Sequence, residues 1–133
     1  MRSATKKRTG KDPDYLDWIR TLPCVCCVGL ERFLRLVAGT QTWLDVAKLI
    51  ENQRYPTEAA HVGQRGLSQK CPDRQAIPLC ELHHTRGRES HHRLQKKFWS
   101  FWFIDRDALI AELNSRFKEE HGNDAGTRTI NTD

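Results

Sequence analysis

The sequence predicts an α+β fold, in which two short strands and a helix form a small core surrounded by further helices. Two short apolar runs, residues 59–62 and 75–79, flank a polar loop, and apolar residues recur at helical spacing on either side. The 133-residue chain holds five Cys and six His, and its hydrophobic fraction is only 38%. Such a small apolar core indicates that bound metal supplies part of the folding energy. We expect one domain over residues 1–122, with a helical-hairpin insertion at 28–57.

The overall charge favours a polyanionic partner. The chain has 22 Lys and Arg against 17 Asp and Glu, a formal net charge of +5, which suits nucleic acid. No apolar run reaches the roughly 20 residues that cross a bilayer, so we expect no membrane partner. Residues 1–11 are basic without an apolar stretch behind them, so they are not expected to be a secretory signal. In a cytoplasmic chain, paired Cys residues are metal ligands more often than disulfides.

A first helix is expected after Asp12, a typical N-cap residue that is followed by Pro13 at the first helical position. Pro23 should end this helix. Cys24 and Cys27 come next with two residues between them, a spacing that lets one tight turn aim two thiolates at one ion.

Two amphipathic segments before the first strand predict the helical hairpin. Leu30, Phe33, Leu34 and Val37 fall at i, i+3, i+4 and i+7, and the same spacing recurs between residues 43 and 50. Such an apolar stripe is more typical of a core or a dimer face than of a catalytic surface, so a homodimer through this hairpin is an open possibility.

The second half of the chain carries the densest group of reactive side chains. His61 lies in the first strand, and Cys80, His83 and His84 follow the second. Adjacent residues on a helix project about 100° apart, so His83 and His84 can serve different sites. Gly87 interrupts the helix that they open.

The C-terminal third of the sequence predicts a segment that belongs to the core, followed by a disordered tail. An aromatic segment at residues 98–103 is expected in the core, because the chain is poor in aliphatic residues. Asp105 should cap a last helix with inward-facing apolar residues from Leu109 to Phe117. Residues 123–133 are polar and are expected to form a disordered tail.

Cys24, Cys27, Cys80 and His83 form a Cys3His set in two half-sites of equal spacing. Tetrahedral zinc takes such ligands, and a site with all four positions filled by protein is structural. An alternative assignment puts Cys71 or Cys26 in place of His83.

Four motifs together resemble the HNH endonuclease family, whose ββα-metal core has a strand with a His, a loop, a second strand and a helix with another His. The motifs are Pro23 to Cys27, the Ala-Ala-His of 59–61, the loop 66–73 with its Gly, Lys and Asp, and Ile77 to His84. The chain is similar to small phage- and prophage-associated members that begin with Pro-Cys-x-x-Cys, over residues 14–27 and 57–120. The resemblance implies DNA as the partner and the cytoplasm of a bacterial or phage-infected cell as the location.

The resemblance also implies roles for individual residues. His61 corresponds to the general base that takes a proton from the attacking water, and Gln75 stands near the usual position of an Asn. His84 corresponds to a ligand of one catalytic divalent cation, Mg²⁺, Mn²⁺, Ni²⁺ or Zn²⁺, at the scissile phosphate of DNA. Basic residues could hold the DNA backbone, and the candidates are Arg65, Lys70, Arg74, Arg86 and Arg88.

The chain departs from the family pattern directly before the first His. Many members have Asp or Glu there as a metal ligand, and here the residue is Ala60. The candidates for a replacement ligand are His92, His61 itself and Asp73. Eight residues rise about 12 Å along a straight helix, so His84 and His92 can share an ion only if the chain turns at Gly87.

The second departure is Gln75 in place of Asn, a longer amide whose work Asp73 could do. We therefore expect a metal-dependent HNH-type DNA endonuclease, with His61, Gln75 and Asp73 as catalytic residues and a structural zinc. The alternative, which Ala60 and Gln75 favour, is a catalytically inactive zinc-finger module that binds nucleic acid.

Overall fold

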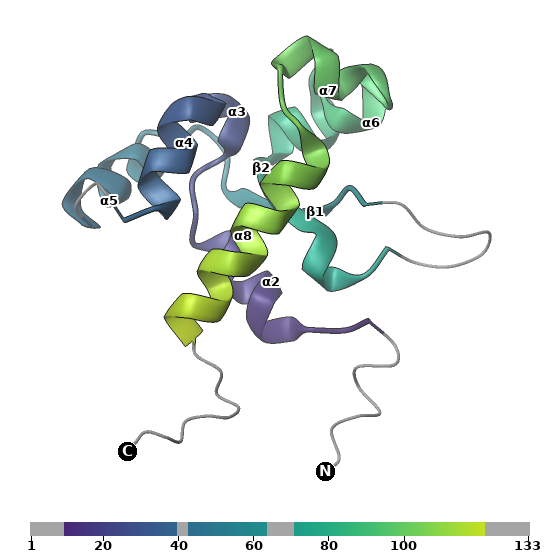
Figure 1. The fold of residues 1–133 in the computed structure, drawn as a ribbon. Coiled ribbons are helices and arrows are strands. Elements are labelled where there is room, and N and C mark those ends of the chain that lie inside the picture. Colours follow the sequence, from purple (N-terminus) through teal and green to yellow (C-terminus); the bar gives the residue numbers. More distant parts are fainter. Residues whose placement is uncertain (1–9, 40–42, 64–70, 122–133) are drawn as a thin grey trace, which may run out of the picture.

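The computed structural model describes residues 10–39, 43–63 and 71–121, and it combines helices with a small antiparallel sheet, compatible with the predicted α+β class (Figure 1). In the described part, the sheet pairs β1 (Thr57–His61) with β2 (Ala76–Cys80). The register sets Ala60 opposite Ile77 and His61 opposite Ala76. Each strand lies within two residues of its predicted bounds. Every residue of β2 is buried, so both faces of that strand are covered.

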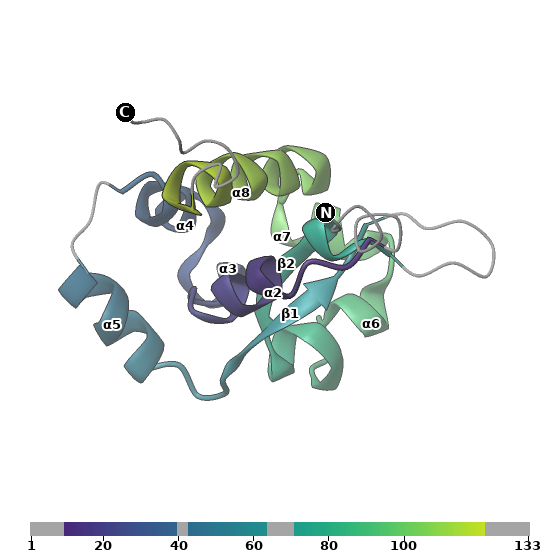
Figure 2. The same cartoon turned by 90° about the horizontal axis from the view of Figure 1, so that it is seen from below.

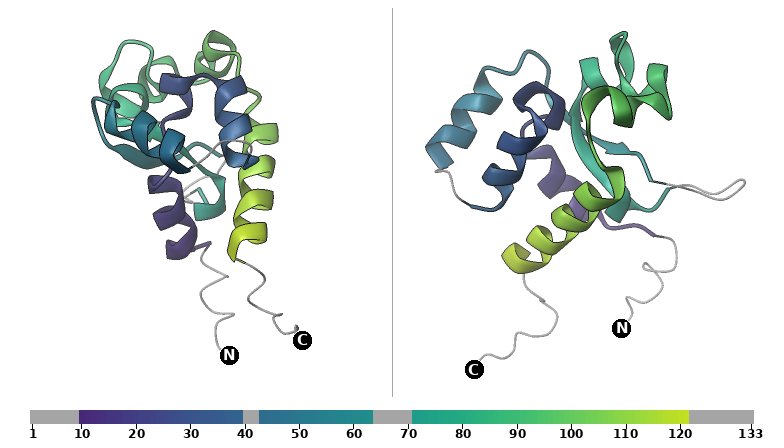
Figure 3. Two further views of the ribbon diagram at one scale, coloured as in Figure 1. Left: turned by 90° about the vertical axis from the view of Figure 1, so that its left-hand side faces the viewer. Right: turned by 45° about the horizontal axis from the view of Figure 1, so that its top comes forward.

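Helical elements precede, separate and follow the strands. In chain order they are α2 (Pro13–Arg20), α3 (Val25–Val28), α4 (Leu30–Val37), α5 (Trp43–Glu51), η1 (Asp73–Gln75), η2 (Leu82–Arg86), α6 (His91–Leu94), α7 (Lys97–Trp102) and α8 (Arg106–His121). Helices α2 and α8 lie side by side (Figure 3), where the rings of Tyr15 and Phe117 meet edge to face with centroids 5.2 Å apart.

Two helices begin at the caps that the sequence predicts. The Asp12 side chain accepts a hydrogen bond from the Tyr15 N–H at 3.3 Å, at the start of α2. The Asp105 side chain accepts one from the Ala108 N–H at 3.1 Å, at the start of α8. Both cap predictions are confirmed.

The core lies between α2, the sheet, α7 and α8. Tyr15, Ile77, Phe98 and Leu113 are fully buried there. The Tyr15 hydroxyl donates to the Ala76 carbonyl at 3.1 Å, which satisfies the polar end of a buried ring and ties α2 to β2.

The aromatic segment at residues 98–103 is only partly in the core, so that prediction is wrong in part. Phe98 is buried and Trp99 and Trp102 pack against the core, but Phe101 is 50% and Phe103 is 86% exposed. The reason is geometric: α7 is six residues long and presents one face to the core. Phe103 follows it with a left-handed backbone that ends the helix.

The predicted insertion contains two helices, α4 and α5. Two hydrogen bonds from the Arg116 guanidinium, to the carbonyls of Val37 and Ala38, join the end of α4 to α8. Helix α5 lies at the outer edge of the molecule (Figure 2). Dimerisation through this hairpin stays a prediction, and the expected tail at 123–133 lies outside the described residues. No helix in the described ranges is long and apolar enough to cross a membrane.

Candidate metal centre and candidate active site

Four side chains converge from three elements into one cluster. Cys24 precedes α3 and Cys27 lies within it, Cys80 ends β2, and His83 lies in η2. The His83 Nδ1 lies 3.5, 3.6 and 3.2 Å from the sulfurs of Cys24, Cys27 and Cys80. The sulfurs of Cys27 and Cys80 lie 3.7 Å apart.

These separations suit a tetrahedral ion. With Zn–S bonds of about 2.3 Å and Zn–N bonds of about 2.0 Å, the ligand atoms of a tetrahedral zinc lie roughly 3.5–3.8 Å apart. All four ligand atoms here lie within 4.8 Å of one another, so the cluster could hold a structural metal such as zinc. His83 fills the fourth position of this set, rather than Cys71 or Cys26.

The pKa shifts in the cluster differ from one ligand to the next. Burial alone would raise the pKa of Cys24, but hydrogen bonds from the neighbouring thiols and from His83 outweigh it and hold that pKa below its usual range. Hydrogen bonds to Cys24 and Cys80 raise the pKa of His83 to about 10. Cys24 is thus held as the thiolate that binds a divalent ion. Hydrogen bonds to Cys24 and Cys80 raise the pKa of Cys27, and His83 keeps its proton near pH 7, so a bound ion would displace protons from both residues.

A glutamine that sequence reasoning missed ties this cluster to the sheet. The Gln53 Oε1 accepts the Cys24 backbone N–H at 2.8 Å. The Gln53 Nε2 donates to the Tyr55 carbonyl at 2.7 Å and to the Thr57 Oγ1 at 2.9 Å, at the start of β1. Nothing in the local sequence marks this amide, because its partner lies 29 residues away.

The chain turns sharply between His84 and His92. The π-helical turn η2 closes with a 2.8 Å hydrogen bond from the Gly87 N–H to the Leu82 carbonyl. The buried Ser90 then begins α6 by accepting from the Arg93 N–H at 3.2 Å. The turn brings the rings of His84 and His92 to 4.9 Å between centroids. A turn at Gly87 is what the sequence requires if both histidines are to face one ion.

Replacing Gly87 with Ala should open this turn. An added Cβ would lie 2.7 Å from the Leu82 carbonyl oxygen, closer than a Cβ approaches a backbone atom, so the backbone must shift. We expect Gly87→Ala to lower the free energy of unfolding by about 1–3 kcal/mol, measured by urea denaturation. Ser115→Ala, on the exposed side of α8, is the control and should change it by less than about 0.5 kcal/mol. Equal stability of both variants would contradict the close-approach argument.

His61 ends β1 and is paired with a carboxylate. Its Nε2 lies 2.8 Å from Asp73 Oδ1, and Asp73 Oδ2 accepts the Asp12 backbone N–H at 2.6 Å. Burial alone would raise the pKa of Asp73, but the hydrogen bonds from Asp12 and His61 lower it on balance. Because an ionised Asp73 favours a proton on Nε2 of His61, the lone pair of the neutral imidazole is left on Nδ1.

The structure does not bring His61 together with His84 and His92. Residues three apart in a strand project to opposite faces, so His61 and Glu58 lie on different sides of β1. Glu58 is the residue that contacts His84, with its Oε1 2.7 Å from Nδ1. Within the described ranges, Cys3His is the one group of three or more His, Cys, Asp or Glu whose ligand atoms converge. A catalytic ion held by all three histidines stays a prediction.

His91 anchors the turn from inside. Its Nδ1 is buried and has no partner among the described residues. Burial, followed by the charges of His92, His84 and Arg106, lowers the pKa of His91 to about 4, so the ring is neutral near pH 7. Its ring packs edge to face on Phe98, with centroids 5.3 Å apart, which fixes α6 against α7 and positions the neighbouring His92.

The basic residues predicted to hold DNA are placed unevenly. Arg65 and Lys70 lie outside the described residues. Arg74 pairs with Asp12 and Arg86 pairs with Glu81, whereas Arg88 is exposed.

A polar pocket of about 430 Å³ opens beside Gly63, which lies two residues after the end of β1. Gln75 and Arg74 line it, and α8 contributes Arg106 and Asn114. The Gln75 amide thus faces this pocket and the Cys71 sulfur, which lies 3.7 Å from its Oε1.

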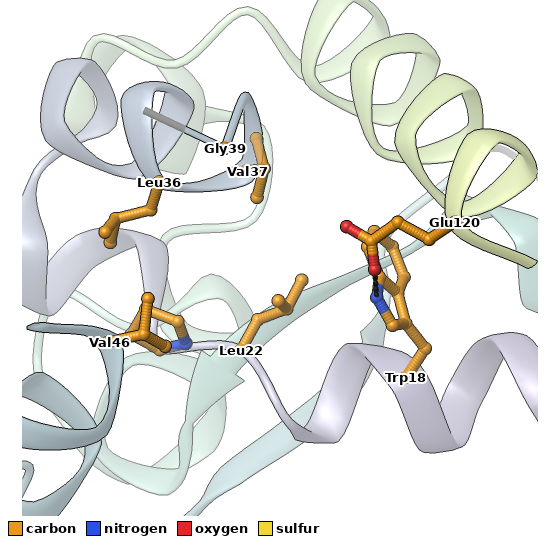
Figure 4. Close-up of a pocket in the computed structure, with 8 residues that line it drawn as sticks. Trp18, Leu22, Leu36, Val37, Gly39, Val46 and Glu120 are labelled. Atoms are coloured by element: carbon orange, nitrogen blue, oxygen red, sulfur yellow. Dashed lines mark hydrogen bonds between the residues drawn. The ribbon is translucent and has the colours of Figure 1, made fainter. Parts of the chain in front are cut away.

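A second pocket, of about 120 Å³, lies between α2, α4, α5 and α8 and is apolar (Figure 4). Its one carboxylate, Glu120, accepts a hydrogen bond from Trp18 Nε1 at 3.1 Å. Leu22, Leu36 and Val46 point into it. It contains no histidine or cysteine, so it is separate from the candidate site.

Comparison with protein-family models, with curated proteins and with solved structures finds no match for this chain.

Proposed function

We propose that this chain is a metal-dependent HNH-type endonuclease that hydrolyses phosphodiester bonds in DNA. One observation carries the proposal. The turn at Gly87 brings the rings of His84 and His92 together. This turn follows two strands joined by a loop, and the first of these strands ends at His61, which contacts Asp73. The motifs that resemble the HNH family therefore coincide with two separate pairs, His84 with His92 and His61 with Asp73.

His61 acts as the general base. Asp73 accepts its Nε2–H, which fixes the ring and leaves Nδ1 to take a proton from the attacking water. Asp73 is held in turn by the Asp12 backbone N–H, so the base is oriented by a second residue and by the segment that precedes α2.

His84 and His92 would hold the divalent cation, and Cys24, Cys27, Cys80 and His83 a structural zinc. A bound divalent cation supplies charge stabilisation for the phosphate and the leaving oxygen. His83 belongs to the candidate zinc site and the adjacent His84 belongs to the candidate catalytic site. A zinc ion bound to His83 would therefore help to fix the position of His84.

DNA is the substrate that the charge and the polar surface favour. The chain carries a net charge of +5, and the exposed Arg88 lies in the η2–α6 turn between the paired histidines. The polar pocket with Arg74, Arg106 and Gln75 offers a place for backbone phosphate beside the end of β1.

A plasmid-nicking assay tests the proposal. Zinc-loaded wild-type protein is incubated with supercoiled plasmid and added Mg²⁺, Mn²⁺, Ni²⁺ or Zn²⁺, and nicked circles should appear only with an added ion. A His84→Ala preparation, purified identically, controls for contaminating nuclease and should not nick. Tight binding of DNA without nicking under any ion would contradict the proposal and favour the non-catalytic nucleic-acid-binding module.

A further inference from the structure

We infer that Glu58 is a positioning residue, whose carboxylate holds Nδ1 of His84 so that Nε2 is free for a divalent cation. The inference rests on the proposed function, because it assigns a role within the same site. Its basis is one contact: Glu58 Oε1 lies 2.7 Å from His84 Nδ1.

Strand geometry explains how a carboxylate at position 58 reaches the side of the sheet on which an acid at position 60 would lie. Residues two apart in a strand share a face and lie roughly 6.6 Å apart. Glu58 and Ala60 are such a pair on β1, opposite Leu79 and Ile77 of β2. A carboxylate on the longer Glu side chain therefore approaches the same side of the sheet, and η2 brings His84 over that side.

The contact between Glu58 and His84 is specific and partly shielded from solvent. The side chain of His84 is 19% exposed and that of Glu58 is 43% exposed. Within the described ranges His84 is the hydrogen-bond partner of the Glu58 carboxylate, while the nearby Arg86 pairs with Glu81 instead. The Glu58 carboxylate is thus directed at the imidazole and not at a neighbouring cation.

The chemistry follows from the two nitrogens of the ring. A carboxylate that accepts the Nδ1–H fixes the tautomer, orients the ring and makes the other nitrogen a better ligand. Nε2 lies on the far side of the ring from Glu58, and the ring of His92 lies 4.9 Å away between centroids, almost perpendicular to that of His84. Glu58 therefore acts through His84 and is not itself a ligand.

The test measures metal affinity rather than cleavage. Isothermal titration with Mn²⁺ or Ni²⁺ is carried out on full-length protein with its zinc content verified, for wild type, Glu58→Ala, Glu58→Gln and Glu112→Ala. Loss of such a supporting carboxylate typically costs 10–100-fold in metal affinity. We expect that loss for Glu58→Ala, a smaller one for Glu58→Gln, which keeps an acceptor oxygen, and none for Glu112→Ala on α8.

A second readout separates positioning from folding. Two-bond ¹H–¹⁵N spectra of the histidine rings should show His84 protonated at Nδ1 in the wild type, and a mixture of tautomers in Glu58→Ala. Thermal melting of the variants checks that the fold is kept. Wild-type affinity in Glu58→Ala, or a wild-type His84 protonated at Nε2, would overturn the inference.

The outcomes also distinguish this inference from the proposed function. If Glu58→Ala weakens metal binding as expected but the wild type never nicks DNA, the inference stands and the endonuclease proposal fails. If the wild type nicks DNA and Glu58→Ala binds metal normally, only the inference fails. A wild type that binds no ion besides zinc overturns both.

Discussion

Removing the metal from Cys24, Cys27, Cys80 and His83 is expected to unfold the domain. These ligands join the loop after α2, the end of β2 and the start of η2, so the ion would hold together elements far apart in the sequence. Structural zinc contributes about 10–16 kcal/mol in small zinc-finger peptides, whereas a whole domain of ordinary stability has only about 5–15 kcal/mol. Its loss can therefore exceed the entire stability of the fold.

The measurement is far-UV circular dichroism and thermal melting, with and without a chelator, on protein of known zinc content. Cys80→Ser should lose both zinc and the cooperative transition. Cys26→Ser is the matched control, because Cys26 lies in the same turn but outside the four-ligand set, and it should keep one zinc per chain. A chain that stays folded after complete metal removal would show that the cluster is not structural.

His61→Ala is expected to lower the nicking rate by about 10²–10⁴-fold, the usual contribution of a positioned general base. DNA affinity should stay close to that of the wild type, because His61 is proposed to act on water and not to hold the strand. The rates come from single-turnover nicking of plasmid at saturating protein, and the affinities from fluorescence anisotropy of a labelled duplex.

Asp73→Asn should lower the rate less than His61→Ala. An amide can no longer bind the His61 Nε2–H with a negative charge, but the imidazole itself remains. His121→Ala, a histidine near the end of α8 outside the site, is the control and should nick at the wild-type rate. Undiminished nicking by His61→Ala would reject this residue as the base.

Local signals account for the parts of the fold that the sequence predicted. The caps at Asp12 and Asp105 depend on residues three positions away, and the spacing of Cys24 and Cys27 depends on one turn. The exposure of Phe103 was not predictable in this way, because it depends on where α7 ends against the core.

The candidate site likewise contains some residues that local sequence signals predict and others that depend on long-range packing. The Cys3His set follows from two spacings, and a turn at Gly87 was the condition for His84 and His92 to share one ion. Glu58 and Gln53 were missed because their partners are fixed by the register of β1 and by long-range packing, 26 and 29 residues away. A polar residue two positions before Ala60 on the same strand face was the one available signal for Glu58.

The hydrogen bond between Cys24 and Gln53 means that the chain leaves the metal cluster and returns to it at nearly the same point. The excursion between them is a closed loop, and doubling the length of a flexible loop costs only about 0.6 kcal/mol. Helix α4 is tied to α8 through Arg116, but α5 lies at the edge. The exposed side of α5, which includes Lys48 and Glu51, is therefore a place where this protein can carry an attached fluorophore or peptide while Cys24 and β1 keep their positions.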